Sequence, residues 1–195
     1  MFQKSKNPIL INELKEIINI IDKSEKDENK KVRDKALILV GFSGGFRRSE
    51  LVNIDFEDLE FTKEGVKIFI KRSKTDQSGE GMIKAIPYFK EKSFCPVNFL
   101  KNWIEISKLN TGYIFNISDK MVAILIKKYL AAAGFDSKKY SGHSLRSGFA
   151  TVAAGSGADE KSIMTMTGHK TTQMVRRYIK ESNLFKNNAL SKVDL

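Results

Sequence analysis

Hydrophobic side chains recur at helical spacing over the first part of this chain. Between Ile11 and Asp22 the apolar residues fall on one face, which predicts an amphipathic helix. The charged stretch 23–30 that follows predicts a solvated loop. The apolar stretch from Ala36 to Phe42 predicts a buried helix that ends near the Gly44–Gly45 pair, and residues 48–54 predict a short helix after it.

Apolar and polar residues alternate with a period of two farther along the chain. Residues 66–71 alternate in this way, as a half-buried strand does. Residues 56–61 and 82–88 are also β-like, and the polar segment 72–81 connects the second and third stretches. The pattern therefore predicts a small antiparallel sheet whose last connection carries lysines.

Helical periodicity returns after the predicted sheet. Pro96 suits the first turn of a helix, and Ser118 can cap a longer helix that ends near Gly134. Further helices are expected over residues 144–154, 159–167 and 171–181. We therefore expect a mainly α fold with a small antiparallel β-sheet (class α+β), with one domain over residues 1–181 and a polar C-terminal tail over 182–195.

Composition adds a strong positive charge to this picture. The 195 residues, 41% of them hydrophobic, suffice for one sizeable core. They include 34 Lys and Arg against 23 Asp and Glu, a formal charge of +11. Residues 1–30 hold six Lys and six acidic residues, so the whole excess lies in residues 31–195. A polyanionic partner would explain the excess, and a basic protein that is simply soluble is the alternative.

The remaining composition bears on the compartment. A single cysteine, Cys95, cannot form a disulfide within the chain, and we expect it to be a small buried side chain in a reducing compartment. The N-terminus has no apolar stretch like that of a signal peptide, and no apolar run approaches the roughly 18 residues of a membrane span. We expect a cytoplasmic protein without a membrane partner.

Residues able to act on a phosphate occur in three separate places. His143 and Arg146 are three residues apart at the start of a predicted helix, so both can face one point. The second histidine, His169, precedes Tyr178 by nine residues, and Tyr178 lies about two turns into the next helix. Upstream, two glycines lead Arg47 into the start of a short helix, and a helix N-terminus together with an arginine favours a bound phosphate.

These strings resemble the motifs of the tyrosine recombinases of the phage integrase family. Gly45-Phe-Arg-Arg-Ser-Glu-Leu51 is similar to their first arginine motif, and His143-Ser-Leu-Arg146 to their His-x-x-Arg motif. Gly168-His169 followed by Tyr178 has the family's spacing of third basic position and nucleophile, and Lys74 resembles the β-hairpin lysine. Each motif alone is weak, but four in the family's order over residues 45–178 are specific.

The resemblance implies a DNA breaking-rejoining catalytic fold and a site-specific recombinase or integrase. Such an enzyme cleaves and rejoins DNA strands through a 3′-phosphotyrosine, without metal, ATP or other cofactor. Tyr178 would be the nucleophile, since a tyrosine ester preserves the phosphodiester energy for religation. Arg47 and Arg146 would bind the non-bridging oxygens, which gather charge during attack. Arg48 is the competing choice for the first arginine.

Four more residues receive roles from the resemblance and from their chemistry. Lys74 is the candidate general acid for the departing 5′ oxygen, with Lys71 as its rival. His143 can help move the tyrosine proton or bind phosphate, and His169 can donate to a phosphate oxygen. Glu50 can orient the basic cluster, although a glutamate in a first helical turn also commonly serves the helix dipole.

Partners follow from the same resemblance. We expect double-stranded DNA and self-association on it as a tetrameric synapse, with the tail exchanged between subunits. If the tail forms a helix, its apolar residues would share one face: Leu184, Phe185, Ala189 and Leu190. A frayed terminus is the alternative. The family's N-terminal core-binding domain is expected to be absent.

Two other functions remain open at the level of sequence. A type IB topoisomerase-like enzyme would relax DNA by similar chemistry, and a catalytically silent regulator would bind DNA without a covalent adduct. A metal nuclease is disfavoured, because the two histidines lack the nearby carboxylates that hard-metal phosphoryl chemistry usually needs.

Overall fold

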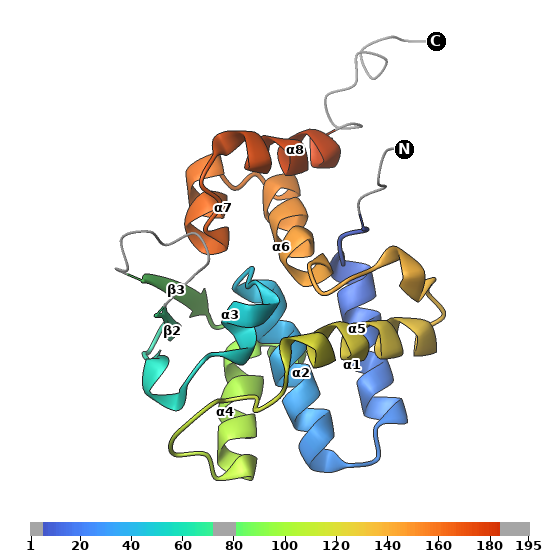
Figure 1. The fold of residues 1–195 in the computed structure, drawn as a ribbon, viewed down its shortest axis with the longest axis vertical. Helices are drawn as coiled ribbons and strands as arrows, with labels where there is room; N and C mark the ends of the chain where they lie inside the picture. Colours follow the sequence, from blue (N-terminus) through green and yellow to red (C-terminus); the bar gives the residue numbers. More distant parts are fainter. Residues whose placement is uncertain (1–5, 72–80, 184–195) are drawn as a thin grey trace.

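Helices make up most of the computed structural model, which describes residues 6–71 and 81–183, and one small sheet lies at its left edge in Figure 1. Within these residues the α-helices are Ile11–Ser24 (α1), Glu28–Ser43 (α2), Arg48–Val52 (α3), Pro96–Ser107 (α4), Asp119–Ala132 (α5), Ser144–Gly155 (α6), Glu160–Thr167 (α7) and Thr172–Asn183 (α8). The strands are Leu59–Phe61 (β1), Gly65–Ile70 (β2) and Met82–Pro87 (β3). The 3-10 turns are Phe56–Asp58 (η1), Lys92–Phe94 (η2) and Ser137–Lys139 (η3). The predicted fold class is confirmed.

The loop predicted over the charged stretch 23–30 is wrong where α2 begins. The helix already begins at Glu28, because the Asp27 carboxylate accepts a hydrogen bond from the Lys30 backbone N–H at 3.1 Å. A side-chain acceptor at this position satisfies a donor that the first helical turn leaves without a partner. Only residues 25–27 separate α1 from α2. The polar residues 28–30 that follow form the exposed first turn of α2.

The antiparallel sheet has the order β1-β2-β3. In β2 the side chains of Val66, Ile68 and Ile70 are buried while those between them are exposed, as the alternation predicted. The first strand is shorter than predicted, since residues 56–58 form the turn η1. The Asp55 carboxylate accepts from the Phe56 N–H at 3.0 Å, and the Asp58 carboxylate accepts from the Asp55 N–H at 3.1 Å. These two bonds curl the backbone before it can pair with β2.

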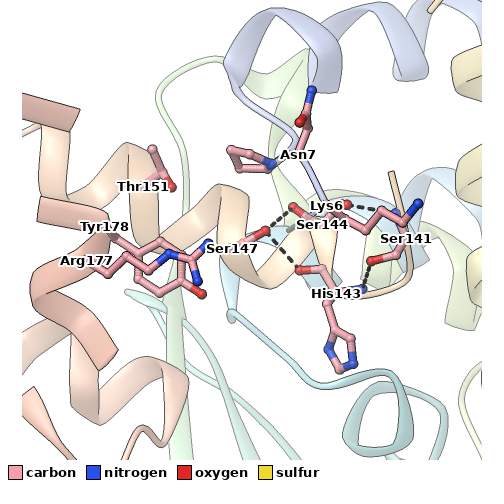
Figure 2. A pocket seen from close by; sticks show the side chains of 10 residues that line it. Lys6, Asn7, Ser141, His143, Ser144, Ser147, Thr151, Arg177 and Tyr178 are labelled. Atoms are coloured by element: carbon pink, nitrogen blue, oxygen red, sulfur yellow. Dashed lines mark hydrogen bonds between the residues drawn. The ribbon is translucent and has the colours of Figure 1, made fainter. Parts of the chain in front are cut away.

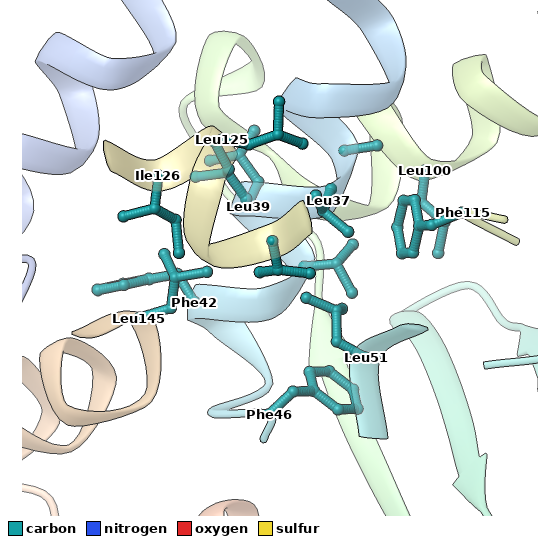
Figure 3. Packing of buried hydrophobic residues seen from close by; sticks show 14 of the residues in the cluster. Leu37, Leu39, Phe42, Phe46, Leu51, Leu100, Phe115, Leu125, Ile126 and Leu145 are labelled. Atoms are coloured by element: carbon teal, nitrogen blue, oxygen red, sulfur yellow. The ribbon is translucent and has the colours of Figure 1, made fainter. Parts of the chain in front are cut away.

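The main hydrophobic core forms around α2, which packs on α1, α3, α4 and α6 (Figure 3). Its residues from Ala36 to Val40 are each at most 1% exposed, so this helix is buried on all sides as predicted. Cys95, just before α4, is fully buried in the same core. Because α2 is fixed by this core, the turn that leaves its C-terminal end starts from a rigid support.

A second, smaller cluster holds the C-terminal helices together. Ala150 and Ala154 of α6, Ile163 of α7 and Val175 of α8 form it, with Tyr178 packed partly against it. Helix α8 therefore rests on α6 and α7, which carry it above the rest of the molecule in Figure 1. In the described part of the chain, no helix is both long and apolar enough to cross a membrane.

Candidate active site

The turn after α2 delivers Arg47 into the site. Gly45 has a φ of +54°, and a Cβ at this position would lie 2.9 Å from the Phe149 ring, so the turn requires glycine. Arg47 then caps α3, where the Glu50 carboxylate accepts from its backbone N–H at 3.0 Å and from its Nη1 at 2.5 Å. Its Nη2 donates to the Gly168 carbonyl at 3.2 Å. The turn and Glu50 thus fix both ends of the Arg47 side chain.

Arg48 has a different environment. Its Nη1 donates to the Asp119 carbonyl at 3.5 Å, and its Nη2 lies 3.8 Å from the Asp119 carboxylate, at the start of α5. Arg47 contacts Gly168, directly before His169, whereas Arg48 contacts Asp119 at the start of α5. The geometry favours Arg47 as the phosphate-binding arginine.

Arg146 and His143 stand at the start of α6. Arg146 is only 6% exposed, and its Nη1 donates to the Gly45 carbonyl at 2.9 Å, which joins α6 to the turn before Arg47. Burial and the nearby charge of Arg47 lower the pKa of Arg146 to about 10, so it stays charged at neutral pH. His143 is exposed, and partial desolvation together with Arg48 and Arg146 lowers its pKa.

His169 follows the C-terminal end of α7, where Gly168 has a φ of +63°. The Thr167 hydroxyl donates to the Ile163 carbonyl at 2.6 Å and also lies 2.7 Å from Nδ1 of His169. A hydroxyl has one proton, so Nδ1 is the donor to Thr167, and Nε2 of the neutral ring carries no proton. Burial and the charges of Arg146 and Arg47 lower the pKa of His169 to about 4. The expected donation to a phosphate oxygen therefore requires that His169 gains a proton when the phosphate binds.

Tyr178 lies half-buried on α8, beside both histidines. Its ring centroid is 6.0 Å from that of His169, with the planes tilted by 35°. It also shares with His143 a cavity of about 400 Å³, which Figure 2 shows between α6 and α8. The cavity is lined by Lys6, Asn7, Pro8, Ser141, His143, Ser144, Ser147, Thr151, Arg177 and Tyr178. A strand entering this cavity would meet the phenol and the imidazole together.

The two candidate hairpin lysines differ in what the structure places. Lys74 lies outside the described residues, so its role stays an expectation. Lys71, its rival, has its ammonium 2.9 Å from the Asp58 carboxylate, and this hydrogen bond raises the pKa of Lys71. The contact ties the end of β2 to η1, which gives Lys71 a structural partner.

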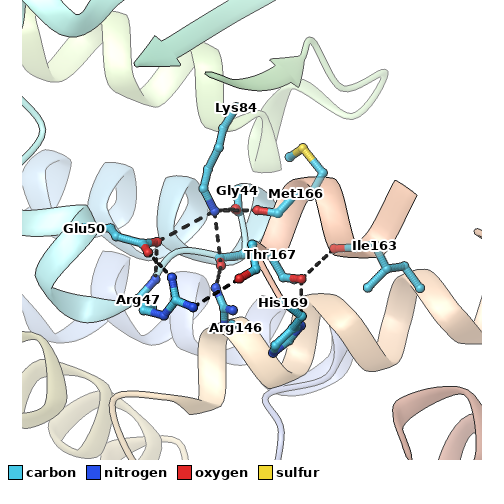
Figure 4. Close-up of polar contacts among 11 residues, drawn as sticks. Gly44, Arg47, Glu50, Lys84, Arg146, Ile163, Met166, Thr167 and His169 are labelled. Carbon is cyan, nitrogen blue, oxygen red and sulfur yellow. Dashed lines mark hydrogen bonds and ion pairs between the residues drawn. The ribbon is translucent and has the colours of Figure 1, made fainter. Parts of the chain in front are cut away.

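Lys84 is a site residue that the sequence analysis missed. It lies on β3 with no exposed surface, and its Nζ donates to the carbonyls of Gly44 at 2.8 Å and Met166 at 2.5 Å (Figure 4). The Glu50 carboxylate is 3.8 Å away. Burial lowers the pKa of Lys84 to about 7, with Glu50 acting in the opposite direction. The available signal was its strand position, since Lys84 is in phase with buried Ile86 and directly opposite buried Ile68.

The cluster has more positive than negative charge. Arg47, Arg146 and Lys84 surround one carboxylate, that of Glu50. Each of the two arginines lowers the pKa of Lys84, so the three cations repel one another. A bound phosphate would relieve this repulsion. In residues 6–71 and 81–183, no group of three or more His, Cys, Asp or Glu side chains is arranged to hold a metal ion.

The chain matches known proteins over nearly its whole length. The model of the phage integrase family matches residues 9–184. The integrase/recombinase xerD homolog of Selenomonas ruminantium is 45% identical over 204 residues, which cover 98% of this chain and 59% of that relative. Tyrosine recombinase XerC of Caldanaerobacter subterraneus subsp. tengcongensis is 32% identical over 180 residues, 90% of this chain and 48% of that relative. The chain thus spans about half the length of the curated relatives it matches.

Solved structures share the fold at low sequence identity. The XerH recombinase bound to a palindromic difH substrate superimposes with a TM-score of 0.79 at 20% identity, over 96% of this chain and 53% of that one. A lambda integrase dimer bound to a COC′ core site gives a TM-score of 0.68 at 17% identity, over 100% of this chain and 53% of that one. The resemblance drawn from the motifs is confirmed: this chain belongs to the phage integrase family of tyrosine recombinases.

Proposed function

We propose that this chain is the catalytic domain of a site-specific DNA recombinase that cleaves and rejoins strands through a covalent bond to Tyr178. One observation carries the proposal. Three segments far apart in sequence bring two arginines and two histidines around one basic site beside the half-buried phenol of α8. This is the set of groups that a metal-free transesterification at phosphorus needs.

The proposed reaction is a reversible transesterification. The Tyr178 oxygen attacks the scissile phosphorus, so that a tyrosine–phosphorus bond forms while the bond to the 5′ oxygen breaks. Arg47 and Arg146 bind the non-bridging oxygens, with Glu50 orienting Arg47. His143, which shares the cavity with Tyr178, assists removal of the phenol proton. The 5′ oxygen leaves with a proton from Lys74, and the reverse steps rejoin the strand.

DNA binding and self-association belong to the same proposal. The XerH neighbour is bound to its difH substrate, and the lambda integrase neighbour is a dimer on a core site. The charge of +11 on this chain suits a DNA backbone. We propose that the full protein binds paired sites as a tetramer in the cytoplasm.

A covalent-adduct experiment tests the function. The protein is incubated with a nicked suicide duplex in excess chelator, and a covalent protein–DNA band is expected with the wild type and not with Tyr178→Phe. The Phe variant should bind the duplex within about threefold of wild type, because binding is spread over many phosphate contacts. An adduct with Tyr178→Phe would contradict the assignment of Tyr178 as the nucleophile. If neither the wild type nor the variant forms an adduct, the result supports a catalytically silent DNA-binding regulator. Relaxation of plasmid without recombination of paired sites would instead support the topoisomerase-like alternative.

A further inference from the structure

A buried lysine stands behind the arginines and has no part in the reaction described above. Lys84 has 0% exposed surface, and its ammonium points from β3 into the space between α3 and the end of α7 (Figure 4). Its Nζ donates hydrogen bonds to the carbonyls of Gly44 at 2.8 Å, Gly45 at 3.5 Å and Met166 at 2.5 Å. With its surface covered and its protons directed at carbonyls, this lysine cannot touch DNA.

Each contact of Lys84 belongs to a segment that carries a phosphate-binding group. Gly44 and Gly45 form the turn that leads into Arg47, and the Gly45 carbonyl also accepts from Arg146. Met166 lies at the end of α7, shortly before His169. The Glu50 carboxylate, 3.8 Å away, is the partner of Arg47. One ammonium therefore ties together the supports of both arginines and of the second histidine.

The position costs stability, and packing alone does not account for it. Removing an ammonium from water costs several kcal/mol, so cores rarely contain lysine. The titratable groups that face Lys84 are Glu50 of α3, Arg47 just before α3, Arg146 of α6 and the neutral ring of His169. Of these, only Glu50 attracts the ammonium. The residue opposite in the sheet is Ile68, so an apolar side chain would suit this face. Replacing a buried charge by a well-packed apolar residue is often neutral or stabilising.

We propose that Lys84 is a positioning residue, whose ammonium fixes the Gly44–Gly45 turn, Glu50 and the end of α7 so that Arg47, Arg146 and His169 meet one phosphate in a single arrangement. The inference rests on the proposed function. Small errors in the placement of such groups slow chemistry strongly, about a hundredfold for a shift near 1 Å. Ground-state DNA binding, which depends on many distributed contacts, should change little.

The test compares Lys84→Met and Lys84→Gln, which remove the charge, with Lys84→Arg, which keeps it. Lys67→Met is the matched control, because Lys67 lies on neighbouring β2, is exposed and pairs with Glu60 at 2.9 Å. Thermal melting establishes folding, a gel shift gives the DNA affinity, and single-turnover adduct formation at saturating suicide duplex gives the rate. We expect both neutral variants to bind within about threefold of wild type and to cleave about a hundredfold more slowly. Lys84→Arg should recover part of the rate, and Lys67→Met should match wild type.

A second substrate separates positioning from proton donation. A 5′-bridging phosphorothiolate has a leaving group that needs little protonation, so it rescues a missing general acid. We expect no such rescue for the neutral Lys84 variants. Rescue would overturn the proposal in favour of a proton donor, and a folded variant with the wild-type rate would overturn it outright. Failure of both neutral variants to fold would show a purely structural lysine. If the wild type itself forms no adduct, the proposed function fails first and this inference with it.

Discussion

Arg146, like Arg47, is held by the backbone of a segment distant in sequence. Arg146 is 6% exposed and its guanidinium donates to the Gly45 carbonyl, so it is placed before any substrate arrives. Such a group stabilises charge that develops in the transition state more than it contributes to initial binding. Its loss should therefore appear in the chemical step.

We expect Arg146→Ala to lower the single-turnover cleavage rate by about a thousandfold and DNA affinity by less than about fivefold. Arg146→Lys should remain far below wild type, because an ammonium lacks the paired donors of the guanidinium. Rapid-quench cleavage and gel shifts on the same duplex measure the two effects. Equal losses in rate and affinity would reduce Arg146 to a ground-state phosphate contact.

His169 should make the stability of the free protein depend on pH. Burial and the charges of Arg146 and Arg47 hold its pKa at about 4, below the usual value of 6.5. The unfolded chain therefore binds a proton more tightly than the folded one, so stability is full above pH 6.5 and falls as the pH drops towards 4. The loss attributable to His169 should reach up to about 3 kcal/mol.

Urea unfolding between pH 7.5 and 4.5 measures this dependence. His169→Asn should flatten the curve over this range, while its amide keeps a polar group near the position of Nδ1 beside Thr167. His143, whose pKa is also lowered, is exposed and should contribute less. An unchanged slope in His169→Asn would contradict the buried, neutral state of this histidine.

Short motifs singled out the candidate site residues, but they could not reveal the buried contacts between distant segments. Glycines or polar residues that mark a turn or a helix start lie next to Arg47, Arg146 and His169. Local sequence is therefore enough to single these residues out. That Arg47 and not Arg48 faces the cluster depends on Gly168 and Asp119, which are distant in sequence. Lys84 shows its role only when β3 packs against α3 and α7.

At the scale of elements, periodicity predicted the helices and β2 well and short polar caps poorly. Helix α5 begins where Ser118 accepts from the Met121 N–H at 3.3 Å, as its cap signal indicated. Two of the errors, residues 28–30 and 56–58, lie beside an aspartate, Asp27 or Asp55, that satisfies backbone donors locally. Where hydrophobic periodicity is lacking, it gives no prediction of secondary structure. The hydrogen bonds of the aspartate side chain to backbone N–H groups then decide whether the chain forms a helix or a 3-10 turn.

The connection between β2 and β3 carries the proposed general acid. Lys74 lies in that connection, outside the described residues, whereas Lys71 at the end of β2 pairs with Asp58 at 2.9 Å. An ammonium already bound to a carboxylate is a weaker candidate for donating its proton, because the pairing raises the pKa of Lys71. Position in the hairpin and the ion pair both favour Lys74.

We expect Lys74→Ala to slow cleavage of ordinary DNA by about a hundredfold or more and to regain most of that rate on a 5′-bridging phosphorothiolate. Lys71→Ala should cleave both substrates at similar rates, with some loss of thermal stability from the broken contact with Asp58. The ratio of rates on the two substrates is the measurement. Rescue of Lys71→Ala in place of Lys74→Ala would transfer the proton donor to Lys71.

At the scale of the whole molecule, the proposed nucleophile Tyr178 packs on a different hydrophobic cluster from the one that supports Arg47, which we propose binds phosphate. Arg47 and Glu50 extend from the large core around α2, while Tyr178 rests on the four-residue cluster shared by α6, α7 and α8. A small cluster buries less apolar area, so it opens at lower free energy than the main core. Movement of α8 would therefore displace Tyr178 while the arginines stay in place.

That division gives the C-terminal tail a way to connect assembly with chemistry. Residues 184–195 lie outside the described structure and follow α8 directly, with Leu184 and Phe185 only a few positions after Tyr178. If the tail binds a neighbouring subunit on DNA, as the sequence resemblance leads us to expect, assembly fixes α8 and hence the phenol. Deleting residues 184–195 should then leave the melting temperature of the main core unchanged and reduce cooperative binding to paired sites by about tenfold, since the tail links two bound subunits. Gel-shift titrations on single and paired sites measure this. Weaker binding to a single site as well would indicate lost DNA contacts, and unchanged cooperativity would contradict the exchange.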